Sequence, residues 1–262
     1  QLPADKREMV ESITMDLSDC MRAIAREAFP QATVIRDCFH VVKRGGEGCE
    51  EIRLRLKREA VKKVNRQKAE FRKYLKGLAA QRKAYRERMR AKYGKKWKKS
   101  KRGKKPKRLN ARFEPPRLVN GETLVEALTR CRKQLSMSRE KWSLVQEKRA
   151  EILFERYPKL EEAYNLINSL RAVFRNKKLT RETAKEKLEE WYEKVAACSL
   201  REIKSVRDTI KFYEDEILNY FIERQTNASA ESLNSKIKCF RAQVKGVRDI
   251  PFFMYRLATV LG

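Results

Sequence analysis

Polar side chains recur at helical spacing near the end of the printed sequence. Four of them share one face of a helix, at positions i, i+4, i+7 and i+11: Asn227, Glu231, Asn234 and Lys238. A neighbouring apolar stripe contains Ala230, Leu233, Ile237 and Phe240. Such a helix can pack on a sheet and direct one carboxylate along its edge. A single helical glutamate is usually solvated, but the flanking amides favour a catalytic or metal-binding role for Glu231. The accessory polar groups would then be Asn227, Asn234 and Lys238.

Two further carboxylates end short segments with strand character. Glu11–Asp16 alternates polar and apolar residues, and Ala32–Asp37 is rich in β-branched ones. Between them, Ser18–Phe29 has a helical pattern with Ser18 as a plausible N-cap. This order predicts the strand–helix–strand unit of parallel sheets. Asp16 and Asp37 would stand at the carboxyl ends of the strands, where such sheets place ligands, so both are candidate site residues.

The only histidine of the sequence follows the second strand. Any serine or cysteine nucleophile activated by histidine would therefore have to use His40. Asp37, three residues earlier, is placed to orient its ring, and a hydrogen-bonded histidine at a strand end is the alternative interpretation. The glycine-rich Gly45–Gly48 lacks the Gly-Lys-Ser/Thr of a phosphate-binding loop, so we interpret it as a hinge.

The charge of the chain predicts a polyanionic partner. There are 64 Lys and Arg against 35 Asp and Glu, a formal net charge of +29, which favours nucleic acid first and an anionic membrane surface second. No apolar run approaches the roughly 20 residues that span a bilayer. The six cysteines form no CxxC pair, a pattern typical of reduced thiols and not of a disulfide framework or a zinc site.

Most of this charge lies in one segment. Residues 53–112 contain 28 Lys and Arg and three Glu, and Gly94, Gly103 and Pro106 interrupt any helix near its end. We predict a basic loop at about 93–118. Phosphate binding with some aromatic stacking explains its composition better than solvation alone. The predicted DNA-binding residues are Lys95, Lys96, Trp97, Lys98, Lys99, Lys101, Arg102, Lys104, Lys105, Lys107 and Arg108.

The rest of the chain from Gly48 onward has a helical pattern. Helical periodicity ends near residue 92 and returns after the loop. Tyr157-Pro158 and Asn176–Lys178 interrupt the pattern. The further helices are predicted at about 121–155, 160–175, 181–197 and 200–223.

Two groups of short motifs stand at the two ends of the sequence. The upstream motifs are Asp16-Leu17-Ser18, Phe29-Pro30-Gln31-Ala32 and Asp37-Cys38-Phe39-His40-Val41-Val42-Lys43. The downstream residues are Thr226, Asn227, Glu231, Asn234, Ile237 and Lys238, then Gly246, Arg248, Phe252 and Arg256. In order and local spacing these motifs resemble the bacterial ISL-three family of DDE transposases. The resemblance is dense over about 10–45 and 215–260.

The resemblance implies an α/β fold, a partial RNase H-like catalytic core interrupted by a long, mostly α-helical insertion. Residues 1–45 would belong to the core, 46–222 would form the insertion, and 223–262 would supply the catalytic and closing helices. Such enzymes hold two Mg²⁺ ions, or Mn²⁺ in their place, between two aspartates and a glutamate. Asp16 and Glu231 would be metal ligands and Asp37 and His40 accessory catalytic residues. Asp37 as the ligand in place of Asp16 is the alternative.

The same resemblance implies metal-dependent cleavage and transfer of double-stranded DNA at element ends and target. It further implies a homodimer, no membrane partner, and a location in the bacterial cytoplasm with the nucleoid. The family's first catalytic aspartate would precede this chain, so we expect the chain alone to be inactive. The alternatives are a non-catalytic basic nucleic-acid binder or a decayed transposase remnant, and a helical scaffold or membrane-surface protein.

Overall fold

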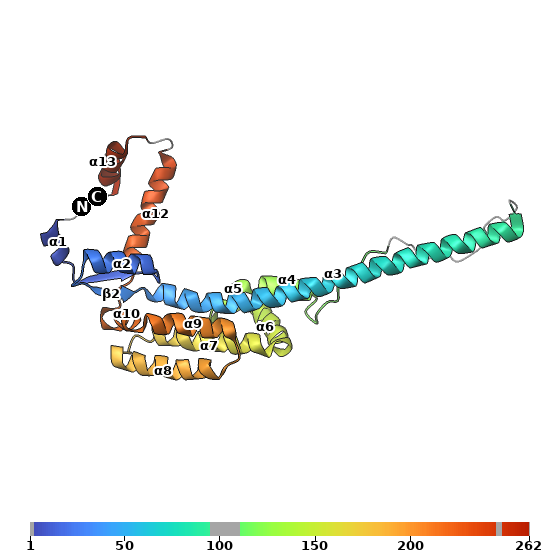
Figure 1. Cartoon of the computed structure of the whole chain (residues 1–262), viewed down its shortest axis with the longest axis horizontal. Coiled ribbons are helices and arrows are strands. Elements are labelled where there is room, and N and C mark those ends of the chain that lie inside the picture. Colours follow the sequence, from blue (N-terminus) through green and yellow to red (C-terminus); the bar gives the residue numbers. More distant parts are fainter. Residues whose placement is uncertain (1–2, 95–110, 245–247, 262) are drawn as a thin grey trace. The chain divides into compact units, whose positions relative to one another are not determined.

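The computed structural model describes residues 3–94, 111–244 and 248–261, and this part of the chain is mostly helical (Figure 1). The chain divides into two compact units. The first unit comprises residues 1–49 and 162–262, and the second comprises residues 50–161. The division implied by the resemblance, with residues 46–222 as an insertion, stays a prediction.

A two-stranded parallel sheet lies in the first unit. After the short helix α1 (Ala4–Glu8), strand β1 (Ser12–Met15) leads into helix α2 (Asp19–Ala28) and then strand β2 (Thr33–Arg36). The Ser18 side chain accepts a hydrogen bond from a first-turn amide of α2. The predicted strand–helix–strand unit and the mixed α/β class are therefore confirmed. Within the described residues the sheet has two strands, so a fuller RNase H-like core stays a prediction.

Helices form the remainder of the first unit. The predicted breaks after residues 156 and 175 are confirmed, whereas the single helix expected over 200–223 is three shorter ones. Buried apolar side chains such as Leu188, Ile203 and Val206 form its core. The helices are α7 (Pro158–Arg175), α8 (Arg181–Ala197), α9 (Arg201–Phe212), α10 (Glu214–Leu218) and α11 (Tyr220–Glu223).

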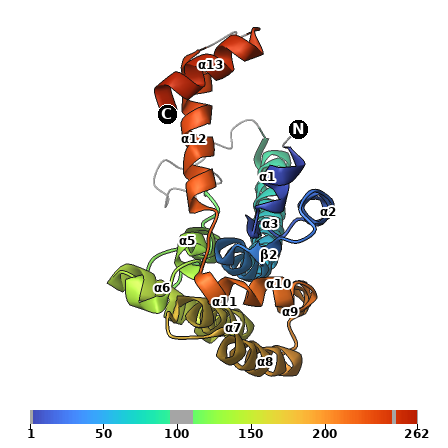
Figure 2. The same ribbon diagram turned by 90° about the vertical axis from the view of Figure 1, so that its left-hand side faces the viewer.

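The last two helices of the first unit pack against each other (Figure 2). They are α12 (Ala228–Gln243) and α13 (Ile250–Leu261). Phe240 is buried, and its ring centroid lies 5.5 Å from that of Phe253. Leu233, in the apolar stripe expected to pack on a sheet, is 49% exposed. The predicted helix is thus present, and its buried contact is with another helix.

The glycine-rich segment is helical, so the predicted hinge at Gly45–Gly48 is wrong. It lies inside the continuous helix α3 (Cys38–Tyr93). A Cβ atom on Gly48 would lie 2.8 Å from a methyl carbon of Val206 in α9. One on Gly45 would lie 3.3 Å from a methyl carbon of Leu170 in α7. These glycines let neighbouring helices approach α3, which outweighs their low helix propensity.

Two glycines of α3 are expected to respond oppositely to alanine. Gly48→Ala should lower the free energy of unfolding by about 1–3 kcal/mol, because the new methyl group overlaps Val206. Gly77→Ala, with no atom within 4 Å of the added Cβ, should raise it by up to about 1 kcal/mol. Urea unfolding of both variants measures this. Equal effects of the two substitutions would contradict the packing role of Gly48.

The second unit contains residues 50–93 of α3 and several short helices. They are α4 (Leu124–Arg130), α5 (Arg132–Leu135), the 3₁₀ helix η2 (Arg139–Lys141) and α6 (Leu144–Arg156). The single helix expected over 121–155 is therefore wrong. Capping boxes at Thr123 and Ser143 begin α4 and α6, and such caps favour new helix starts. No helix in the described part of the chain has the length and hydrophobicity needed to cross a bilayer.

A buried ion pair in the second unit predicts acid sensitivity. Glu122 accepts hydrogen bonds from Arg149 at 2.7 and 2.8 Å and from Arg130 at 2.7 Å. The Arg149 guanidinium is the main cause that holds the pKa of Glu122 at about 2, below its ordinary 4.5. A lowered folded-state pKa stabilises the fold above pH 4.5, and this contribution is lost as the pH falls from about 4.5 towards 2.

Glu122→Gln should therefore destabilise the protein at pH 7 by on the order of 2 kcal/mol. The difference in the free energy of unfolding between this variant and the wild-type protein should shrink by more than half at pH 3. Urea unfolding at the two pH values tests this, with Glu126→Gln, an exposed capping-box substitution, as a control. A difference that is the same at both pH values would refute the role of the Glu122 carboxylate.

Candidate metal centre at the edge of the sheet

Both candidate aspartates follow the last paired residues of the sheet. Met15 and Arg36 are partners in the parallel register, and the Asp37 amide donates a 2.8 Å hydrogen bond to the Met15 carbonyl. Asp16 and Asp37 are the next residues on the two strands. Each therefore stands at the carboxyl edge of the sheet, as the sequence predicts.

Three of the predicted site residues come together at this edge. One potential ligand atom from each of Asp37, His40 and Glu231 lies within 4.8 Å of the other two. Asp37 is buried, His40 is half-buried and Glu231 is exposed. Asp37 immediately precedes α3, and His40 lies in its first turn, whereas Glu231 lies in the first turn of α12. Residues almost 200 positions apart thus form one cluster.

Backbone amides hold the Asp37 carboxylate in place. Its Oδ1 accepts a 3.0 Å hydrogen bond from the Phe39 amide, as the residue before a helix commonly does. Its Oδ2 accepts a 3.4 Å hydrogen bond from the Asn227 amide at the start of α12. This second contact ties the helix that bears Glu231 to the sheet edge.

His40 has a ring nitrogen available for the same cluster. Its Nδ1 lies 3.6 Å from Asp37 Oδ2, beyond a good hydrogen bond, and is buried without a hydrogen-bond partner among the described residues. The Phe39 ring contacts the imidazole edge-on at 5.3 Å between centroids. The nitrogen can therefore bind a cation, or hold a proton that faces the Asp37 carboxylate.

Asp16 is not in the Asp37–His40–Glu231 cluster. Its carbonyl oxygen accepts a hydrogen bond from the Arg36 guanidinium. Its Oδ1 is buried and has no hydrogen-bond partner in the described part of the chain. A buried carboxylate oxygen without a partner is unfavourable unless a cation or water satisfies it. The geometry thus brings Asp37 together with Glu231, and Asp16 as a metal ligand stays a prediction.

The accessory polar groups are distributed along α12. Asn227 precedes the helix and is half-buried, while Asn234 and Lys238 are exposed. Only Asn227 has a recorded contact with the cluster, and it acts through its backbone amide. Roles for the Asn234 and Lys238 side chains stay predictions.

The ligand atoms fit a hard divalent cation. Two carboxylates and an imidazole are present, and carboxylate oxygens suit Mg²⁺ and Mn²⁺. The unpartnered Asp16 Oδ1 is a further oxygen at the same sheet edge. Burial raises the pKa of the neighbouring Cys38 thiol, so Cys38 is protonated at neutral pH and supplies no thiolate.

A buried ionic cluster, which sequence reasoning missed, supports the two strand ends. Arg36 is fully buried and donates from Nε to Glu216 Oε2 at 2.7 Å, and Arg22 donates to the other oxygen at 2.6 Å. The Arg36 guanidinium also stacks 4.1 Å from the Tyr213 ring centroid. The hydroxyl of Tyr213 donates to Asp19 at 2.7 Å. Arg36 is one of 64 basic residues, and nothing in the sequence distinguishes it from the others.

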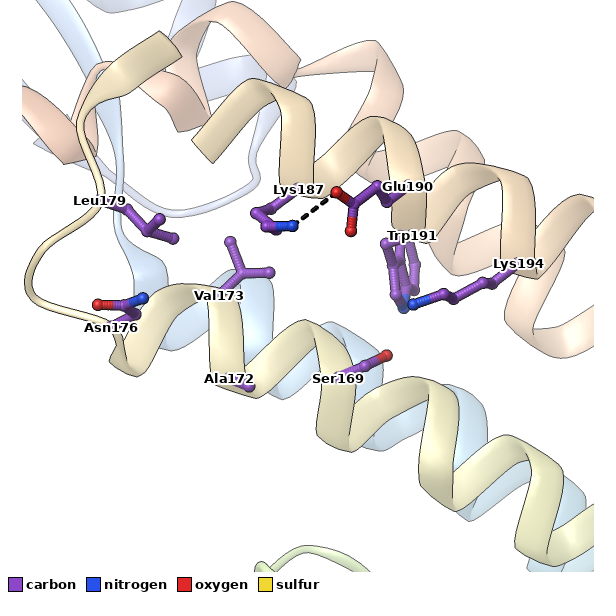
Figure 3. A pocket seen from close by; sticks show the side chains of 9 residues that line it. All are labelled: Ser169, Ala172, Val173, Asn176, Leu179, Lys187, Glu190, Trp191 and Lys194. Carbon is purple, nitrogen blue, oxygen red and sulfur yellow. Dashed lines mark hydrogen bonds and ion pairs between the residues drawn. The ribbon is translucent and has the colours of Figure 1, made fainter. Parts of the chain in front are cut away.

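A separate pocket of about 230 Å³ lies between α7 and α8 (Figure 3). Lys187 and Glu190 form a 2.6 Å ion pair at its rim, and the buried Trp191 lines one side. None of the predicted site residues lines this pocket. The predicted DNA-binding set Lys95–Arg108 lies outside the described residues.

Comparison with known proteins gives a family. A family model described as a transposase matches residues 1–257. No curated protein and no solved structure matches the chain.

Proposed function

Because the chain belongs to the ISL-three transposase family, we propose that it is the catalytic part of a DDE transposase, which cuts and joins DNA at the ends of an insertion sequence. The observation that supports this proposal most directly is the Asp37–His40–Glu231 cluster at the sheet edge. A protein that only binds DNA has no need of converging carboxylates beside a histidine.

The residues that would hold the metal are Asp37 and Glu231, with Asp16 as the further carboxylate. When bound, the divalent ions activate water or a DNA 3′-hydroxyl for attack on a phosphodiester and neutralise the developing charge. The carboxylates themselves create a negative site that is unfavourable without a cation. His40 Nδ1, facing Asp37 Oδ2, can hold a proton close to the reacting groups.

The partners follow from the family and from the charge. A transposase acts on DNA, and the net charge of +29 favours its phosphate backbone. We propose double-stranded DNA at element ends and at the target as the substrate. We further propose Mg²⁺ as the physiological ion, a homodimer as the working state, and the bacterial nucleoid as the location.

The second candidate function is DNA binding without catalysis. The charge alone supports it, because 64 Lys and Arg against 35 acids suffice for a phosphate-binding protein. The two candidates differ in whether the acidic cluster binds a divalent ion.

Titration of this chain with Mn²⁺, followed by electron paramagnetic resonance, tests the proposed function. We expect saturable binding, weakened at least tenfold by Asp37→Asn and by Glu231→Gln. The control is Asp215→Asn, whose side chain is 91% exposed, and which should leave the affinity unchanged. If neither cluster variant changes Mn²⁺ binding, the metal centre and the catalytic proposal both fail.

A further inference from the structure

The part of α3 that belongs to the second unit carries a dense positive charge. Residues 61–93 contain 13 Lys and Arg and two Glu, within one uninterrupted helix of the second unit. A loop of this composition would lose conformational freedom when it bound a ligand. A helix has already fixed the spacing of its side chains, so less entropy is lost on binding.

An apolar stripe follows one side of this helix. Its members recur mostly every three, four or seven residues and are half-buried: Val64, Phe71, Leu75, Leu78 and Met89. The ring of Phe71 lies 5.9 Å from that of Phe113, which belongs to the segment that returns along the helix. The stripe is therefore already covered in part by its own chain.

A row of exposed basic residues lies about a quarter-turn around the helix from this stripe, at 100° per residue. The row, called here the basic row, consists of Arg72, Lys76, Lys83, Arg86 and Arg90. Its members are spaced by three, four or seven residues, so they share one face. Only Lys83 has a recorded ion pair, a long 3.9 Å contact with Glu87. Exposed pairs of this kind hold their partners weakly.

The dimensions of the basic row fit duplex DNA. At a rise of 1.5 Å per residue, the 18 steps from Arg72 to Arg90 span about 27 Å. A duplex of that length carries about eight phosphates on each strand. Five cations on one face therefore meet a comparable row of anions. A membrane surface fits less well, because an interfacial helix buries its apolar side in lipid and this stripe is already half-buried.

We propose that the basic row of α3 is a docking surface for duplex DNA, which binds phosphates independently of the metal centre and of base sequence. The choice of DNA as the partner rests on the proposed function. The docking surface itself rests on the exposure and alignment of the five side chains.

The test compares two variants that lose the same charge. The row variant replaces all five residues of the basic row by Gln. The control variant replaces five exposed lysines outside α3 by Gln: Lys148, Lys159, Lys177, Lys178 and Lys185. Binding to a 30-base-pair duplex of random sequence is followed by fluorescence anisotropy from 50 to 200 mM NaCl, with EDTA present.

The row variant should reduce the magnitude of the slope of log Kobs against log salt by about 4.5, because each of five phosphate contacts contributes about 0.9. The control should change it by less than about 1. An unchanged slope in the row variant, or an equal change in the control, would overturn the proposal. If the row variant lost binding to phosphatidylserine vesicles and kept its DNA binding, the proposal would also be overturned, in favour of a membrane surface.

Three further measurements keep the result interpretable. Circular dichroism checks that the row variant is folded, and a Lys76→Gln, Arg86→Gln double variant should reduce the slope by about 2 if the larger set unfolds. The row variant should bind Mn²⁺ as the wild-type protein does, because none of its five substitutions lies in the Asp37–His40–Glu231 cluster. The docking-surface proposal can therefore fail while the metal-centre proposal stands. The metal-centre proposal can likewise fail while the docking-surface proposal stands.

Discussion

Glu231→Gln in the intact transposase is expected to lower metal-dependent DNA strand cleavage by on the order of 10³-fold or more, with DNA affinity unchanged. The amide cannot replace the anionic ligand, and a bound metal ion contributes several kcal/mol to the transition state. Glu231 is exposed in the first turn of α12, so its replacement should not disturb the core. Cleavage of a labelled element end in Mg²⁺ measures the effect.

Asp16→Asn and Asp37→Asn distinguish the two ligand assignments. The Asn variant of the aspartate that binds the metal should lose as much cleavage as Glu231→Gln and should lose Mn²⁺ affinity to a matching degree. The Asn variant of the accessory aspartate should lose less cleavage and should retain its Mn²⁺ affinity. Asp215→Asn serves as the neutral control, because its side chain is 91% exposed. Full Mg²⁺-dependent cleavage by Glu231→Gln would exclude the proposed catalytic role of that residue.

Glu216→Leu is expected to reduce the free energy of unfolding by about 3–5 kcal/mol, a large part of the stability of an ordinary domain. The substitution leaves the fully buried Arg36 without its carboxylate partner, and it also unpairs Arg22. An uncompensated buried charge is the physical cause. Urea unfolding followed by circular dichroism measures the change.

The matched control is Glu190→Leu, which removes a 2.6 Å ion pair with Lys187, as short as the Arg22–Glu216 contact. The Glu190 side chain is 52% exposed, so its loss should reduce the free energy of unfolding far less than the loss of Glu216 does. Adding Arg36→Met to Glu216→Leu should recover part of the lost stability, because it removes the unpaired charge. Comparable losses from Glu190→Leu and Glu216→Leu would show that burial of Arg36 does not govern the effect.

The Glu216 result also bears on the metal centre. Arg36 donates to the Asp16 carbonyl and directly precedes Asp37, so it acts as a positioning residue for both strand ends. A milder variant, Glu216→Gln, should therefore weaken Mn²⁺ binding even where the protein remains folded. If a folded Glu216→Gln protein kept wild-type Mn²⁺ affinity, the ionic cluster of Arg22, Arg36 and Glu216 would have only a stabilising role.

Local features of this protein were predictable from the sequence because their causes are local. β-Branched residues and an N-cap serine predict β1, α2 and β2, and the breaks at Tyr157-Pro158 and Asn176–Lys178 follow from backbone preferences. The spacing of Asn227 and Glu231 likewise predicts α12. The family itself follows from short motifs, each of which is a local run of residues within about 10–45 or 215–260.

Other features depended on contacts between distant residues, which no local pattern contains. Only the tertiary structure shows that Gly48 accommodates Val206 within a helix, or that Arg36 is buried against Glu216. Likewise, the sequence places Asp16 and Asp37 at equivalent strand ends, and the folded chain brings Asp37 together with Glu231. The residue types available for the chemistry were thus determined by the sequence, and their convergence was decided by packing of segments almost 200 residues apart.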